Sequence, residues 1–196
     1  RSGGRPGRGA LIGAKPMVQV QRIMIIGGPG SGKTTLARRL GGLTGLPVVH
    51  LDKVSFRPGW VPVPREDLNA KAILAAHEEQ WIIDGNSSET WPYRASRAHL
   101  ILFLDLPRGA RLRRIFWRTL TTLGRTRAGM AEGCPERFDR DVWISAREYD
   151  VEQRKKPLAL IEDCRRRGRP RCVVLRSASA VEWFLREYQA QFSDGS

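Results

Sequence analysis

The sequence predicts an α/β fold in which helices cover both faces of a parallel sheet. Short apolar runs typical of buried strands alternate along the 196 residues with longer runs typical of helices, and parallel strands need crossover connections of this kind. A glycine-rich stretch at 27–35 lies between the first such strand and the first helix. Because the carboxyl ends of parallel strands meet at one edge of a sheet, we expect a ligand-binding cleft at that edge.

The stretch 27–35 has the sequence GGPGSGKTT, which fits the phosphate-binding P-loop pattern G-x-x-x-x-G-K-[ST]. Its glycines let the backbone turn several N–H groups toward one anion, and the following helix adds its positive N-terminal end. We expect Lys33 to reach the β- and γ-phosphates of a nucleotide and Thr34 to ligate Mg²⁺. The residues predicted to bind the nucleotide are Gly28, Pro29, Gly30, Ser31, Gly32, Lys33, Thr34 and Thr35.

Five strands are predicted from short apolar runs, several of them rich in β-branched residues. They span 22–26, 46–52, 81–86, 99–105 and 171–175. The first leads directly into the P-loop, and the next three each bring an aspartate to their carboxyl end. These residues should therefore share one edge of the sheet, although they lie far apart in the sequence.

Six helices are predicted from the segments between and after the strands. They span 34–40, 65–77, 108–120, 136–154, 157–167 and 180–192. A proline starts the fifth of these helices and a glycine follows its last residue, as is typical of helix ends. Loops are predicted at 56–64, which contains prolines and aromatic residues, and at 124–135, which is basic and contains glycines.

The formal net charge of the chain is +14, which suits polyanionic ligands such as nucleotides or nucleic acids without choosing between them. Residues 1–16, rich in Gly, Pro and Arg, are predicted to be a disordered basic leader, with a nucleic-acid-binding arm as the alternative. Residues 17–196 are predicted to form one P-loop domain.

The sequence contains neither an apolar run of about 18 residues nor an apolar signal-peptide core near its start. We therefore expect no membrane partner and a cytoplasmic location. The three cysteines include no C-x-x-C pair, which argues against a disulfide framework or a zinc site and for a reducing compartment.

Three aspartates at strand ends are candidates for chemistry. Asp84 and Asp105 each close an apolar strand, as does the carboxylate that holds Mg²⁺ in P-loop proteins. We prefer Asp84, for which a turn role is the alternative, because Asp105 leads directly into the helix 108–120 and is suited to capping it. Asp52 is placed to orient or deprotonate a hydroxyl acceptor, or to serve Mg²⁺ or positioning if the acceptor is a phosphate; a strand-end cap is the alternative.

A dense set of arginines follows the fourth strand. Arg111, Arg114 and Arg118 share one face of the helix 108–120, and planar guanidinium groups pair well with phosphate oxygens. A solvated basic face is the alternative for part of the set. An apolar stripe on a different face consists of Leu112, Ile115, Phe116 and Leu120. Further arginines follow at Arg125, Arg127 and Arg137.

Several blocks of the sequence together resemble the DNA topology modulation proteins, a family of adenylate-kinase-like P-loop proteins. The blocks are IIGGPGSGKTTLARRL, LPVVHLD, PGW, WIIDGNSS, LFLDLPR, GRTRAGMAEGCPERFD and VVLRS, and they span about residues 20–187. The resemblance implies the nucleoside monophosphate kinase fold, with three αβα layers and a five-stranded parallel sheet in the order 2-3-1-4-5. It also implies an acceptor-binding segment at 53–78 and a mobile lid at 119–137.

The resemblance also implies roles for individual residues. Arg94 corresponds to the arginine that binds the acceptor phosphate, and Arg118 to the one that contacts the triphosphate before the lid. Arg137 and Arg147 correspond to arginines after the lid. The DGNSS run that begins at Asp84 departs from the Asp-Gly-Phe-Pro-Arg run of adenylate kinases, which argues against ordinary AMP phosphorylation.

Together these features predict an ATP-dependent kinase that transfers the γ-phosphoryl group of Mg-ATP to a small acceptor, either a nucleotide or a hydroxyl compound. The expected catalytic residues are Lys33, Asp52, Arg118 and Arg137. Mg²⁺ is assigned to Thr34 and Asp84, and the acceptor to Asp52, Arg94 and Trp60, which can stack on a base or shield the acceptor. The alternative is a nucleic-acid-binding ATPase or regulator that affects DNA topology, favoured by the charge and the family name.

Overall fold

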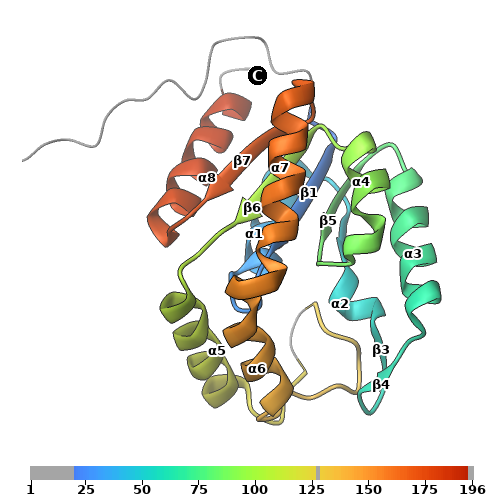
Figure 1. Ribbon diagram of the computed structural model, residues 1–196, viewed down its shortest axis with the longest axis vertical. Coiled ribbons are helices and arrows are strands. Elements are labelled where there is room, and N and C mark those ends of the chain that lie inside the picture. The colour runs from blue at the N-terminus through green and yellow to red at the C-terminus, as the bar shows by residue number, and fades with distance from the viewer. Residues whose placement is uncertain (1–19, 127–128, 194–196) are drawn as a thin grey trace, which may run out of the picture.

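The computed structural model describes residues 20–126 and 129–193. They form three layers, with one parallel sheet between two layers of helices (Figure 1). The strands of this sheet are β1 (Arg22–Gly27), β2 (Val48–His50), β5 (Trp81–Asp84), β6 (Leu100–Leu104) and β7 (Arg171–Leu175). They lie in the order β2-β5-β1-β6-β7, and all four pairings are parallel. Counted along the chain within this sheet, the order is 2-3-1-4-5. The predicted leader 1–16 lies outside the described residues.

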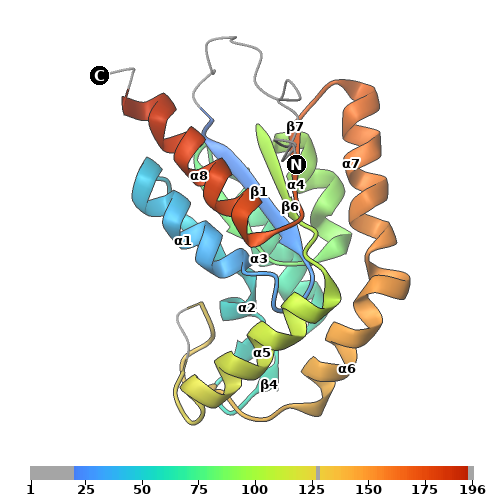
Figure 2. The ribbon, with the colours of Figure 1, turned by 90° about the vertical axis from the view of Figure 1, so that its left-hand side faces the viewer.

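Helices cover both faces of the sheet, as expected. One face carries α1 (Lys33–Thr44) and α8 (Ala178–Ser193), and the other carries α3 (Arg65–His77), α4 (Trp91–Arg97) and α7 (Lys155–Arg167) (Figures 1 and 2). Beyond the carboxyl ends of the strands lie α2 (Leu51–Val54), α5 (Arg108–Thr122) and α6 (Arg140–Glu148). No helix of the described residues has the length and apolar character needed to span a membrane.

The central strand β1 explains why the core has two halves. Successive side chains of a strand point to opposite faces, so Ile23 and Ile25 pack against α1 and α8, while Met24 and Ile26 pack toward α3, α4 and α7. All four side chains are fully buried. The P-loop begins where β1 ends, so this doubly covered strand holds it at the middle of the sheet edge.

Several elements differ in extent from the expectation. The second strand is shorter than 46–52, because α2 begins at Leu51 and places Asp52 in a helical turn. The helix expected at 136–154 begins only at Arg140 and changes after Glu148 into a π-helical turn, Tyr149–Gln153. Helix α4 was not predicted; a proline in its first turn, where it costs no hydrogen bond, hid it from the apolar pattern.

The segment expected to be a loop at 56–64 contains a small antiparallel hairpin, β3 (Phe56–Arg57) and β4 (Val61–Pro62). Its turn requires left-handed backbone at Gly59 (φ +78°) and at Trp60 (φ +64°). A glycine adopts this conformation freely, whereas a tryptophan does so only under constraint from its surroundings. Two-residue strands are too short to give an alternating sequence pattern.

Helix α5 is turned so that Arg111 faces the protein and half of the predicted apolar stripe is exposed. Arg111 is 1% exposed, whereas Phe116 is 45%, Trp117 59% and Leu120 56% exposed. From the predicted stripe, Ile115 is buried. The reason is the position of the helix beside the P-loop, where buried backbone carbonyls need donors.

Candidate active site

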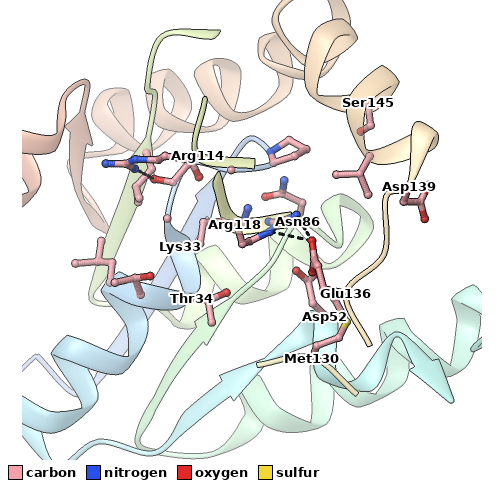
Figure 3. A pocket seen from close by; sticks show the side chains of 18 of the residues that line it. Lys33, Thr34, Asp52, Asn86, Arg114, Arg118, Met130, Glu136, Asp139 and Ser145 are labelled. Carbon is pink, nitrogen blue, oxygen red and sulfur yellow. Dashed lines mark hydrogen bonds and ion pairs between the residues drawn. The ribbon is translucent and has the colours of Figure 1, made fainter. Parts of the chain in front are cut away.

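A cavity of about 940 Å³ opens at the carboxyl edge of the sheet, where the sequence predicted a ligand cleft. It is bounded by the P-loop, α1, α2, the β3–β4 hairpin, α5, the segment 129–139 and the starts of α6 and α8 (Figure 3). The predicted site residues that line it are Pro29, Gly30, Ser31, Gly32, Lys33, Thr34, Thr35, Asp52, Trp60, Arg118 and Arg137. Gly28, Asp84 and Arg94 lie outside this lining.

The P-loop has the backbone that its glycines were expected to provide. Gly30 (φ +73°) and Gly32 (φ +97°) are left-handed, and Ser31 N–H donates to the Gly28 carbonyl at 3.2 Å. Lys33 Nζ donates to the carbonyls of Gly27 at 2.9 Å and Gly28 at 3.2 Å. Burial lowers the pKa of Lys33, and the nearby carboxylates of Asp52 and then Asp84 raise it. Lys33 Nζ is therefore held against the P-loop backbone, beside the position expected for the donor phosphates.

Asp84 lies at the end of β5 beside the P-loop threonine. Its carboxylate accepts a hydrogen bond from Thr34 Oγ1 at 2.9 Å and lies 2.5 Å from His50 Nδ1. A hydroxyl and one carboxylate are donors that Mg²⁺ takes together with water and phosphate oxygens, so this pair fits the ion. No cluster of three or more His, Cys, Asp or Glu side chains suited to a metal is present in the described parts of the chain.

Two neighbours of this pair had been given no role of their own, although Asn86 was expected to line the cleft, as it does. His50, at the end of β2, has its ring against Asp84 and constrains the orientation of that carboxylate. Asn86 follows β5 and forms two hydrogen bonds with Gly27 at the start of the P-loop. Its Nδ2 donates to the Gly27 carbonyl at 2.7 Å, and Gly27 N–H donates to its Oδ1 at 3.3 Å. Asn86 lay in a strand-end run that the sequence had singled out, whereas a single histidine at a strand end gave no signal.

The arginines of α5 support the P-loop from the other side. Arg114 Nη1 donates to the Ser31 carbonyl at 2.8 Å. Arg111 donates to the Pro29 carbonyl at 3.4 Å and forms a 2.8 Å ion pair with Asp150. Its guanidinium also lies 4.8 Å from the ring centre of Tyr149, whose pKa is raised by burial. The sequence had not indicated that the π-helical turn backs the P-loop.

Arg118 and Arg137 reach the cavity but hold carboxylates of the segment 129–139. Arg118 pairs with the buried Glu136 at 3.0 Å, and Arg137 pairs with Asp139 at 3.4 Å. Figure 3 shows Arg118 and Glu136 joined across the cavity. Of the other predicted arginines, Arg125 and Arg147 are exposed outside the lining, and Arg127 lies outside the described residues.

The segment 129–139 packs against Thr34 and His50 and against the β3–β4 hairpin. A Cβ atom at Gly129 would lie 2.6 Å from Thr34 Cγ2 and 3.3 Å from the His50 ring. The segment joins the hairpin through three hydrogen bonds, from Gly59 N–H to Gly133 O, from Cys134 Sγ to Arg57 O, and from Trp60 Nε1 to Pro135 O. It therefore covers one end of the cavity.

The hairpin end of the cavity has an apolar wall and one carboxylate. Phe56, Trp60, Pro62 and Met130 line this end. Phe56 and Trp60 are in edge-to-face contact with ring centres 5.3 Å apart, and the Arg137 guanidinium lies 5.1 Å from the Trp60 ring. Asp52, in the first turn of α2, lines the same region and acts electrostatically on Lys33.

Arg94 is placed beneath this region and not in it. Its side chain is fully buried and donates to the carbonyls of Gly85 at 3.2 Å and Ile83 at 3.3 Å. Burial lowers the pKa of Arg94 to about 9, and Asp84 acts in the opposite sense. In this structure the guanidinium supports the turn after β5; a role in acceptor binding stays a prediction.

Asp105 does not cap α5. That helix begins after Pro107 with no side-chain hydrogen bond at its cap, and Asp105 instead holds Arg154 through bonds of 2.6 and 2.8 Å. The hydrogen bonds from Arg154 lower the pKa of Asp105, although burial opposes them. The cap interpretation is therefore wrong, because the carboxylate binds an arginine distant in the sequence and not the first turn of α5.

No family model matches the chain, and no curated protein matches it. Among solved structures, the fold is similar to that of shikimate kinase from Acinetobacter baumannii in complex with shikimate, with a TM-score of 0.54 and 13% sequence identity. The similarity covers 89% of this chain and 94% of that chain. At this identity the comparison concerns the fold alone. The chain thus has the α/β fold of a P-loop protein of the kinase-like type.

Proposed function

We propose that the protein is a phosphotransferase that transfers the γ-phosphoryl group of ATP to a small acceptor. The observation that carries this proposal is the pairing of a complete P-loop with Asp52, a cavity carboxylate within electrostatic reach of the P-loop lysine. The P-loop suits the donor phosphates, and a carboxylate beside them suits the activation of a hydroxyl acceptor.

The residues predicted to be catalytic or to bind Mg²⁺ each have a role in this proposal. Lys33 and the P-loop amides bind the donor phosphates, and Arg118 and Arg137 exchange their carboxylate partners for the transferred group. Thr34 and Asp84 would hold Mg²⁺, which supplies charge neutralisation to the phosphate oxygens. In the transfer, the acceptor oxygen bonds to the γ-phosphorus, the bond to the β-phosphate oxygen breaks, and the hydroxyl proton passes to Asp52. The segment 129–139 excludes water, as the predicted lid 119–137 would.

We also propose that the chain belongs to the DNA topology modulation family. Two blocks that carried the resemblance, Pro58-Gly59-Trp60 and Gly133-Cys134-Pro135, touch each other at the hairpin end of the cavity. Because these two blocks are far apart in the sequence, their contact supports the view that both belong to the same site. The alternative of nucleic-acid binding rests on the net charge of +14, and it predicts DNA affinity that falls steeply with salt.

The test is transfer of label from γ-labelled ATP into a panel of small acceptors. We expect at least one acceptor to be labelled by the wild type, and labelling to be abolished by Lys33→Ala. Lys71→Ala is the matched control, because Lys71 is an exposed residue of α3 away from the cavity. Release of labelled inorganic phosphate with no labelled acceptor would contradict the proposal.

A further inference from the structure

We infer that the acceptor is a hydroxyl compound that carries no phosphate of its own, neutral or bearing an amine. This inference rests on the proposed function and narrows it, since it concerns which molecules the hairpin end of the cavity can take. It follows from the charges that line the two ends of the cavity, from the position of Arg94 and from the apolar wall.

The cations lining the cavity belong to the donor end, with one exception. Lys33, Arg114 and Arg118 lie along the P-loop and α5, where the first two donate to P-loop carbonyls. Arg39 lines the far side and pairs with Glu182 of α8. Arg137 alone, among the described lining residues, reaches the hairpin end, where it stacks on Trp60. A phosphate on the acceptor would have to share this arginine with the transferred group.

Three carboxylates lie on one side of the cavity. Asp52, Glu136 and Asp139 all line the cavity on the side of α2 and the segment 129–139 (Figure 3). Arg118 and Arg137 are paired with the latter two. Asp52 is the one of the three that lies beside the hairpin. A phosphate bearing two negative charges is repelled by such a lining, whereas a hydroxyl or an ammonium group is not.

Arg94 does not supply the missing cation. Its guanidinium is 0% exposed, lies outside the lining and donates to the carbonyls of Ile83 and Gly85. Reaching an acceptor phosphate would require breaking those bonds and leaving two buried carbonyls without this donor, which is unfavourable. The arginine therefore stabilises the strand end, and the hairpin end of the cavity lacks a dedicated phosphate site among the described residues.

The apolar wall indicates what the acceptor has in place of a phosphate. Phe56, Trp60 and Met130 give an apolar, partly aromatic surface beside Asp52. An acceptor whose body packs on this wall presents its hydroxyl to Asp52, which takes the proton as the oxygen bonds to the γ-phosphorus and ADP leaves. If the acceptor bears an amine, the same wall favours it through cation–π contact.

The experiment compares matched pairs that differ only in a phosphate. Each pair consists of a hydroxyl compound and its phosphate monoester: a nucleoside and its 5′-monophosphate, a polyol and its monophosphate, an amino alcohol and its phosphate ester. Where a pair is used by the enzyme, we expect kcat/KM for the free hydroxyl compound to exceed that for its ester about tenfold or more, the ratio that about 1.4 kcal/mol of repulsion produces. Higher kcat/KM for the phosphate ester would overturn the inference but leave the proposed function standing. Label in no acceptor of any pair, although ATP binds, would count against the proposed function itself.

Arg137→Ala gives a second reading. We expect it to lower kcat and to leave the KM of the acceptor within about threefold, because the arginine serves the transferred group. A tenfold rise in acceptor KM would show that Arg137 anchors an acceptor phosphate, and the inference would then be wrong. Arg140→Ala is the matched control, since Arg140 is exposed at the start of α6 and does not line the cavity.

Discussion

At the scale of single residues, Asp84 is the point where three distant parts of the chain meet. Its two carboxylate oxygens face Thr34 of α1 and His50 of β2, and its side chain is nearly fully buried. A carboxylate held from both sides is oriented before any ion arrives. The histidine is therefore a positioning residue for the predicted Mg²⁺ site.

This position leads to a prediction for His50→Ala. The substitution should weaken Mg²⁺-dependent nucleotide binding about 10- to 100-fold, the usual effect of removing a partner of a metal ligand. Titration of thermal stabilisation by ATP against Mg²⁺ measures it without relying on turnover. His77→Ala, an exposed histidine at the end of α3, should leave the Mg²⁺ dependence unchanged. An unaltered dependence in His50→Ala would show that Asp84 needs no such support.

Asp105 leads to a prediction about pH. Its pKa lies below the ordinary value of 3.8, chiefly through the Arg154 hydrogen bonds, so its contribution to stability is present above that value and is lost as pH falls through the folded-state pKa. Asp105→Asn should lower the free energy of unfolding by about 1–3 kcal/mol near pH 7. The difference from the wild type should narrow as the pH falls below 3.8 in urea titrations.

Asp163→Asn is the matched control for Asp105. Its carboxylate is 38% exposed and pairs with Arg166 and Arg167 along one helix, so its loss should cost less than about 0.5 kcal/mol. A cost for Asp105→Asn equally small, or one that does not depend on pH, would mean that the Arg154 pair contributes little.

At the scale of elements, the P-loop is constrained by the helix that faces it. A Cβ atom at Gly30 would lie 2.6 Å from the backbone oxygen of Arg111, and the residue is left-handed. Gly30→Ala should therefore destabilise the protein by about 1–3 kcal/mol and weaken ATP binding, as measured by denaturant unfolding and by nucleotide titration.

Gly42→Ala is the control for this element. Gly42 lies within α1 with open space around its Cβ position, so alanine should stabilise the helix by about 0.5–1 kcal/mol. If both substitutions behave alike, the close approach of α5 to the P-loop is not a constraint.

The elements also show how far sequence patterns reach. The P-loop and the two-faced strand β1 were predictable because each depends on local residue types: glycines at fixed spacing, and an unbroken apolar run. The orientation of α5 was not, because its arginines bind backbone carbonyls at Pro29 and Ser31, and no helical periodicity records that demand. The same holds for Asp105, whose partner Arg154 lies 49 residues away.

At the scale of the whole molecule, the fold explains why the candidate site could be only partly predicted. Parallel strands bring Asp84 and the P-loop to one edge, so their proximity follows from topology. Glu136 and Trp60 reach the cavity from connections whose shape depends on contacts between loops. Pocket shape and charge therefore had to come from the structure, while the donor site could be read from the chain.

The whole-molecule prediction concerns nucleotide linkage. A ligand that binds only the folded state raises its stability by mass action, about 2.7 kcal/mol at one hundred times its dissociation constant. Mg-ATP should therefore raise the Tm of the wild type and not that of Lys33→Ala, as followed by differential scanning fluorimetry. Equal shifts in both proteins would mean that the nucleotide binds elsewhere.

The contacts between the hairpin and the segment 129–139 have a consequence for the order of events. Because three hydrogen bonds join them, the segment cannot lift from Thr34 without breaking those bonds or carrying Trp60 with it. A single movement of the segment 129–139 and the hairpin would then open the donor end and the acceptor end together. Both substrates would have to be bound before the cavity closes around them. Initial-rate plots should accordingly intersect, as in a sequential mechanism with a ternary complex, and a phosphorylated enzyme released between half-reactions is not expected.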